Sequence, residues 1–322
     1  MYHVSRIPSQ FSISIPEDKN GMIGRECPEP TCESYFKIQL GTGKYSGLKG
    51  QDLPCYCPYC GHNARHDEFF TEAQIEYIKS VALNKVSDAL LKDLKTMEFN
   101  YKPQGGFGIG ISMKVSGRAT PIRYCREEDL ETEVICNKCT LRYMIYGVFG
   151  FCPDCGIHNS LQILEKNFEL IEKLIMLAKT QDASVSQHLI ENALEDCISA
   201  FDGFGRETCR VFATKAIDPK KAADIRFQNI KRAIKNVLEQ FDVDLSSTLD
   251  ATDWVRLQEA FQKRHLLTHK MGVIDAEYQK TTGIPLSLIG RRVSVQPEEI
   301  YSLLRGLRKI GEELYQALES KT

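Results

Sequence analysis

Cysteine spacing is the strongest constraint on how this chain can fold. Eight of its twelve cysteines form two groups of four, and the second group has two C-x2-C pairs separated by twelve residues. Two such pairs facing each other supply the four sulfur ligands that Zn²⁺ takes in closed, tetrahedral structural sites. The sequence therefore predicts two zinc ions, one held by Cys27, Cys32, Cys57 and Cys60 and the other by Cys136, Cys139, Cys152 and Cys155.

The ligand set of the first group has alternatives. Cys55 could replace Cys57, although the two-residue spacing to Cys60 favours Cys57, and His62 and His66 are weaker candidates. Since all four ligands of each site are cysteines, no coordination position stays open for a substrate, and the predicted zinc is structural. Three further cysteines have no ligand spacing and are interpreted as ordinary buried thiols: Cys125, Cys197 and Cys209.

The composition indicates a globular protein of about two domains. The chain has 322 residues, of which 42% are hydrophobic and 26% charged, and no apolar run approaches the ~20 residues of a membrane span. Met1 to Asn20 lacks a secretory signal, so we expect a reducing, cytoplasmic location without membrane contact, where thiols favour metal over disulfide. The net charge of -2 argues against a general polyanion binder.

The N-terminal half is expected to contain two small β zinc ribbons joined by a long helix. We predict a strand and the first ribbon in residues 1–70, the connecting helix in 71–100 and the second ribbon in 101–159. Alternation from Phe11 to Ile15 predicts the strand, and apolar residues at every third or fourth position from Thr71 to Met97 predict the helix. Leu141 to Phe149 has the β-forming composition of a ribbon hairpin.

A glycine-rich stretch from Gly105 to Gly110 has two interpretations. It could cradle a phosphate, but such a loop follows a strand and opens a helix. The residues from Ile109 to Val115 alternate like a strand instead, which favours a bulged or flexible β-connection.

Residues 160–322 have helical periodicity and are predicted to form an antiparallel helical bundle. Asp218-Pro219, Asp250 and Gln296-Pro297 provide caps or a first-turn proline where helices should begin. Apolar residues predict five helices, over Leu161–Ala178, Ile190–Phe201, Ile230–Phe241, Trp254–Phe261 and Ile300–Leu318.

The segment Arg264–His269 continues the fourth of these helices with polar side chains. On a straight helix, Arg264 and His269 point about 140° apart, so only the long arginine could reach toward the histidine. Two copies of the chain related by a two-fold axis would bring two such sets together. The alternative is that His265 and His269 are a structural pair near the helix end.

The same segment resembles the R-φ-x3-H signature of the HEPN domain family, in which φ is a polar residue. HEPN domains are helical bundles that usually dimerise and very often act as metal-independent endoribonucleases in toxin, CRISPR-associated and phage-defence systems. The order and length of the surrounding helices are also similar, and the resemblance covers about half the chain. Some HEPN toxins have a tyrosine two residues after the motif histidine, where this chain has Met271. Control by modification of that tyrosine is therefore not expected.

The resemblance implies catalytic roles for three residues. Arg264 would bind the scissile phosphate, His269 would exchange a proton with the 2′-hydroxyl or the leaving oxygen, and His265 would orient the pair. Attack by the 2′-hydroxyl would leave a 2′,3′-cyclic phosphate and would restrict the reaction to RNA.

Local charge gives a second indication of an RNA partner. Residues 205–235 contain nine Lys or Arg against three acidic residues. Such a block could follow a phosphate backbone, or it could be a solvated helix face.

Together these observations predict a dimeric HEPN-type endoribonuclease acting on RNA, with tRNA among the candidate substrates. The zinc ribbons would recognise a target, a partner or a trigger, and the family suggests a toxin or antiviral defence role. Two alternatives are a non-catalytic binding protein that dimerises through the bundle and a zinc-ribbon transcription-type regulator that binds duplex DNA.

Overall fold

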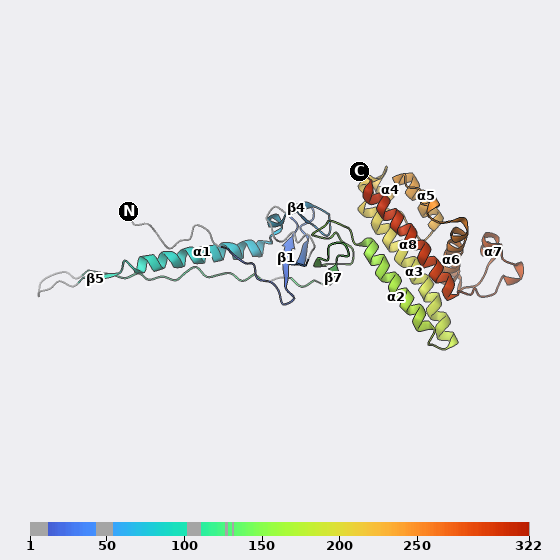
Figure 1. Cartoon of the computed structure of the whole chain (residues 1–322), viewed down its shortest axis with the longest axis horizontal. Coiled ribbons are helices and arrows are strands. Elements are labelled where there is room, and N and C mark those ends of the chain that lie inside the picture. The colour runs from blue at the N-terminus through green and yellow to red at the C-terminus, as the bar shows by residue number, and fades with distance from the viewer. Residues whose placement is uncertain (1–11, 43–53, 102–110, 126–127, 131, 322) are drawn as a thin grey trace. The chain divides into compact units, whose positions relative to one another are not determined.

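The chain folds as two compact units, Met1–Ile157 and His158–Thr322. The computed structural model describes residues 12–42, 54–101, 111–125, 128–130 and 132–321 (Figure 1). The division lies two residues before the predicted start of the bundle at 160. The predicted segments 1–70, 71–100 and 101–159 fall almost entirely within one unit.

A four-stranded antiparallel sheet joins the two predicted ribbons directly. Its order is β1 (Met22–Glu26), β2 (Tyr35–Gln39), β8 (Arg142–Ile145) and β7 (Thr132–Ile135), with Ile38 opposite Tyr143 where the two halves meet. The long helix therefore connects the two ribbons along the chain without keeping them apart. Backbone pairing between β2 and β8 places both cysteine groups in one hydrophobic core.

The prediction of a strand from Phe11 to Ile15 is wrong for the part of that segment that the structure describes. Residues 12–15 form no strand, and Phe11 lies outside the described part. Alternation alone does not make a strand, because a strand also needs a neighbour to complete its hydrogen bonds. A two-stranded ladder, β3 (Pro54–Tyr56) with β4 (Asn63–Arg65), flanks the pair Cys57 and Cys60.

The long helix predicted from Thr71 onward is α1 (Glu72–Lys95), capped by Thr71 and Gln74. It is held by polar contacts: Asn84 donates to the Thr120 carbonyl at 2.6 Å, and Ser80 accepts from the Arg123 amide at 2.9 Å. Most of its apolar stripe stays partly exposed, including Leu90 at 42%.

A short hairpin of β5 (Phe99–Tyr101) and β6 (Ile111–Met113) follows α1. Strand β6 lies inside the predicted strand from Ile109 to Val115, and the glycine-rich stretch 105–110 lies outside the described residues.

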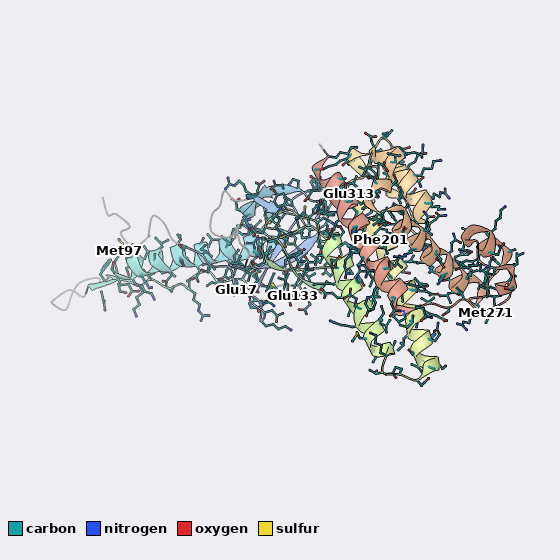
Figure 2. The ribbon with its side chains drawn as sticks, turned by 45° about the vertical axis from the view of Figure 1, so that its right-hand side comes forward. Glu17, Met97, Glu133, Phe201, Met271 and Glu313 are labelled. Atoms are coloured by element: carbon teal, nitrogen blue, oxygen red, sulfur yellow. The ribbon has the colours of Figure 1, made fainter. Side chains whose placement is uncertain are left out.

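The C-terminal unit is mostly helical, and each of the five predicted helices is present. They are α2 (Ser160–Ala178), α3 (Ala183–Val211), α5 (Ile230–Phe241), α6 (Ala251–Lys270) and α8 (Pro297–Ser320). Helices α2, α3 and α8 pack side by side around a core that includes Phe168, Phe201 and Leu307 (Figures 1 and 2).

Helix starts follow the predicted caps. Asp218 and Asp250 cap α4 (Pro219–Ala223) and α6, and Gln296 forms a capping box before Pro297. The short helix α7 (Ala276–Thr282) was not predicted, because seven residues carry too little periodicity to stand out.

Candidate functional site

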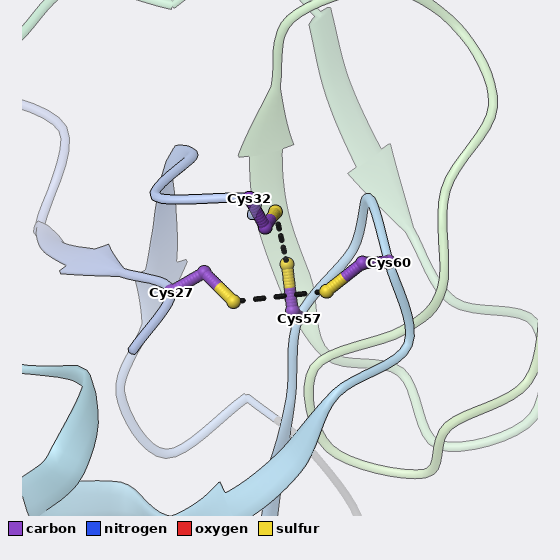
Figure 3. Close-up of side chains that lie close together, drawn as sticks. All are labelled: Cys27, Cys32, Cys57 and Cys60. Atoms are coloured by element: carbon purple, nitrogen blue, oxygen red, sulfur yellow. Dashed lines mark hydrogen bonds between the residues drawn. The ribbon is translucent and has the colours of Figure 1, made fainter. Parts of the chain in front are cut away.

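The structure brings the four cysteines of the first group together. The Sγ atoms of Cys27 and Cys60 lie 3.7 Å apart, as do those of Cys32 and Cys57 (Figure 3). All four Sγ atoms lie within 4.8 Å of one another. A tetrahedral ion with metal–sulfur bonds of about 2.3 Å would separate its ligands by about 3.8 Å, so the geometry fits such an ion.

The second group has the same arrangement. The Sγ atoms of Cys136 and Cys155 are 3.6 Å apart, and those of Cys139 and Cys152 are 3.4 Å apart.

Burial raises the pKa of the Cys27 thiol, in the first group, to about 12. Since a metal ligand must be a thiolate, a bound cation would supply the charge that keeps such buried sulfurs ionised.

The turns that present the sulfurs are alike in both groups. In three of them the amide of the residue after the second cysteine donates to the carbonyl of the first, as Gly61, Thr140 and Gly156 do at 2.9–3.0 Å. These residues, and Glu33 after Cys32, have positive φ. The glycines adopt this conformation freely, which explains their place after Cys60 and Cys155.

The segments 56–61 and 151–156, which carry the second cysteine pair of each group, make reciprocal contacts. The Tyr56 amide donates to the Pro153 carbonyl at 2.9 Å, and the Phe151 amide donates to the Pro58 carbonyl at 2.8 Å. The contacts of the glycines are also reciprocal: Gly61 lies against the Phe151 ring and Gly156 against the Tyr56 ring. Each centre therefore supports the other, which cysteine spacing could not indicate.

The alternative ligands lie outside both groups. Cys55 is fully buried beside the first group, and burial raises the pKa of its thiol to about 12. His62 and His66 are not among the clustered ligands of the described residues, and burial lowers the pKa of His66 to about 4. Cys125, Cys197 and Cys209 are buried thiols.

Arg264, His265 and His269 line one cavity of about 670 Å³. Its walls come from residues 224–236, from α6 and from α7. The rings of His265 and His269 are exposed, with centroids 4.9 Å apart. The Nε atom of Arg264 is buried and has no hydrogen-bond partner among the described residues. The arginine thus reaches the cavity of both histidines despite their angular separation on the helix.

Side-chain hydrogen bonds from Lys263 and Thr268 on α6 fix the rotation of this helix. Buried Lys263 donates to the Glu299 carboxylate at 2.7 Å, and Thr268 donates to Glu195 at 3.0 Å. The helix ends at Lys270, and the capping residue Met271 is left-handed. The Gly272 amide closes the turn on the Leu266 carbonyl at 2.9 Å. Figure 2 shows Met271 beyond this end.

Seven of the nine basic residues in the block 205–235 fall into two sets. Arg210, Lys221 and Lys235 form ion pairs on their own helices, and Lys215 donates to the carbonyls of Leu318 and Glu319. A second set, Arg226, Lys231 and Arg232, is exposed, forms no ion pair among the described residues and lines the same cavity as Arg264. Part of the block is thus an ion-paired helix surface, and the interpretation as a phosphate-binding site stays a prediction for the second set.

Close packing positions the loop that carries Arg226. The Phe227 amide donates to the buried Asp202 carboxylate at 2.6 Å, and the Phe227 ring meets Phe201 edge-on at 5.7 Å. A Cβ on Gly205 would overlap that ring. The absence of a side chain at 205 is therefore what lets this loop reach α3.

We expect Gly205→Ala to destabilise the bundle by about 1–3 kcal/mol, because the added methyl overpacks against Phe227. Gly203→Ala on the same helix is the matched control, since a Cβ there meets nothing within 4 Å. That control should be neutral or stabilising by up to about 1 kcal/mol. Urea unfolding followed by fluorescence of the single tryptophan, Trp254, measures both, and equal stabilities would contradict the packing argument.

Comparisons with known proteins found no matching family model, no matching curated protein and no matching solved structure. Among the described residues, no helix has the length and apolar character needed to cross a membrane.

Proposed function

We propose that the C-terminal unit is a HEPN-type, metal-independent endoribonuclease. The observation that carries the proposal is the shared cavity of Arg264, His265 and His269, with a guanidinium that has no ion pair among the described residues. An unpaired cation beside two imidazoles is suited to binding a phosphate and moving a proton.

The proposed reaction is transesterification within RNA. The 2′-hydroxyl oxygen forms a bond to the adjacent phosphorus and the bond from phosphorus to the 5′-oxygen breaks, leaving a 2′,3′-cyclic phosphate and a 5′-hydroxyl. One proton leaves the 2′-oxygen and one reaches the 5′-oxygen. Arg264 neutralises the phosphate, His269 carries out proton transfer and His265 orients it.

The active form is proposed to be a homodimer. The reaction needs two proton transfers, and each chain supplies one His269. We therefore infer that the His269 side chains of two copies, related by a two-fold axis, divide the roles of acid and base. Exposed apolar side chains near the cavity support this arrangement: Val255 on its wall is 64% exposed and Met271 at the end of α6 is 84% exposed.

The N-terminal unit is proposed to hold two structural Zn²⁺ ions and to recognise a target, partner or trigger. Closed four-cysteine sites supply rigidity rather than a catalytic position. A toxin or antiviral defence role, acting on cellular RNA such as tRNA, is the setting in which such a combination would operate.

Incubation of the purified protein with total RNA and tRNA, with and without EDTA, tests this proposal. We expect cleavage that persists in EDTA and leaves cyclic phosphate and 5′-hydroxyl ends. Cleavage abolished by EDTA while the protein stays folded would contradict the metal-independent mechanism. Sequence-dependent binding of duplex DNA without any RNA cleavage would favour the regulator instead.

A further inference from the structure

We propose that Arg226, Lys231 and Arg232 form a binding site for the backbone of single-stranded RNA, beside the nucleotide held at Arg264. The inference extends the proposed function and rests on it for the identity of the ligand. The inference is based on the part of the cavity wall that does not come from α6. The loop before α5 and the first turn of α5 form this part.

The charges of the cavity favour a polyanion. Arg226, Lys231, Arg232 and Arg264 line it and form no ion pair among the described residues. The lining also contains three carboxylates, Asp224, Glu259 and Glu277. Glu259 lies 3.8 Å from Lys263 and Glu277 lies 3.9 Å from Lys270, although each lysine also pairs more closely with a carboxylate outside the cavity. These four cations against three carboxylates leave the lining net positive, so the local field attracts phosphates although the whole chain is slightly acidic.

The remaining lining favours a nucleotide over a simple anion. Gln228, Asn236, Gln258 and Gln262 place side-chain amides in the same cavity and make no hydrogen bond within the described part of the chain. Amides both donate and accept, which suits the edges of a nucleobase. Phosphate-binding cations on one wall and amides nearby therefore match the two parts of a nucleotide.

The size of the cavity favours a single strand over a duplex. A volume of about 670 Å³ lies in the range of pockets that enclose one small molecule. Paired bases are stacked inside a duplex, and a base must leave the stack before it can enter such a pocket. Neighbouring nucleotides of an unpaired strand can lie along Arg226, Lys231 and Arg232 while one nucleotide occupies the cavity.

The loop that carries Arg226 is fixed rather than adaptable. Phe227 is fully buried, and its amide is anchored to Asp202. This anchoring fixes the backbone from which the exposed Arg226 side chain extends at the cavity. A loop that is already ordered loses less conformational entropy on binding, which strengthens the contribution of Arg226 to affinity.

Binding is measured apart from cleavage with a fluorescein-labelled, single-stranded 2′-O-methyl RNA, whose blocked 2′-oxygen cannot attack. The affinity of the full chain is compared with that of the cavity variant Arg226→Ala/Lys231→Ala/Arg232→Ala by fluorescence anisotropy over a range of salt concentrations. The charge-matched control is Lys173→Ala/Arg206→Ala/Lys220→Ala, which removes three exposed basic side chains that do not line the cavity. Trp254 fluorescence verifies that each variant is folded.

We expect the cavity variant to bind on the order of tenfold more weakly or worse, and its salt slope to fall by about 2, since three phosphate contacts are lost. The control should stay within about twofold of the wild type. Equal losses in the cavity variant and the control would overturn the inference, as would equal affinity for a duplex or full competition by a mononucleotide.

The outcomes separate this inference from the ribonuclease proposal. Loss of binding in the cavity variant, together with a wild type that cleaves no RNA, would retain the binding site and reject the catalytic function. If the wild type cleaves RNA but the cavity variant binds as tightly as the wild type, the catalytic function is retained and the binding site is rejected.

Discussion

Removing the metal ions from the N-terminal unit is expected to unfold that unit and leave the helical bundle folded. Each four-cysteine site can contribute on the order of 10 kcal/mol to folding, more than a small domain has to spare. The two centres share the sheet in which β2 pairs with β8, so loss of one ion should weaken the other site. We expect chelation to give a cooperative loss of structure across the described residues of the N-terminal unit.

The single tryptophan makes this measurement selective. Trp254 lies in α6, so its fluorescence reports on the C-terminal unit alone, while near-ultraviolet circular dichroism also reports on the tyrosines of the N-terminal unit. After treatment with a chelator, limited proteolysis should leave a resistant fragment that begins near His158. Metal analysis should find two zinc ions per chain before treatment.

Cysteine variants provide the controls. Cys139→Ser removes a ligand and should lower the zinc content and the stability of the N-terminal unit, whereas Cys55→Ala should keep two ions because Cys55 lies outside the cluster. A stripped protein that keeps its near-ultraviolet signal and protease resistance would show that the metal is not structural. Zinc loss in Cys55→Ala but not in Cys57→Ala would reassign the ligand.

The second large effect is expected at the proposed catalytic residues. His269→Ala should reduce RNA cleavage by about 10²–10⁴-fold, the usual contribution of a positioned acid or base. Arg264→Ala should lose about 10²–10³-fold, since the developing phosphate charge is then left without its cation. His265→Ala should lose less, because its role is to orient His269, and its pH profile of cleavage should keep the shape of the wild type.

Matched variants separate these effects from general damage. His188 is an exposed histidine on α3, and Arg256 is an exposed arginine on α6; neither lines the cavity. Alanine at either position should leave cleavage within about twofold. If His269→Ala or Arg264→Ala cleaves like these controls, the catalytic assignment is wrong, and the bundle is better explained as a binding or dimerisation module.

The candidate sites differ in how far sequence could predict them. The cysteines of each group were read from spacing, because metal ligands recur at short intervals in tight turns. The choice between Cys55 and Cys57 needed the positions of the sulfurs. The cavity residues Arg226, Lys231 and Arg232 could be seen only as members of a basic block, since sequence does not show which of the block's cations find a local acidic partner.

By itself the sequence determined the local structure of this protein. Helix starts at Asp218, Asp250 and Gln296 follow from capping, and the cysteine turns follow from spacing, because each depends on neighbours a few residues away. Tertiary structure alone decided the pairing of β2 with β8 and the approach of Phe227 to Gly205. Those contacts join residues far apart in the chain. They form where packing and hydrogen bonding are satisfied together, and local sequence patterns do not predict such positions.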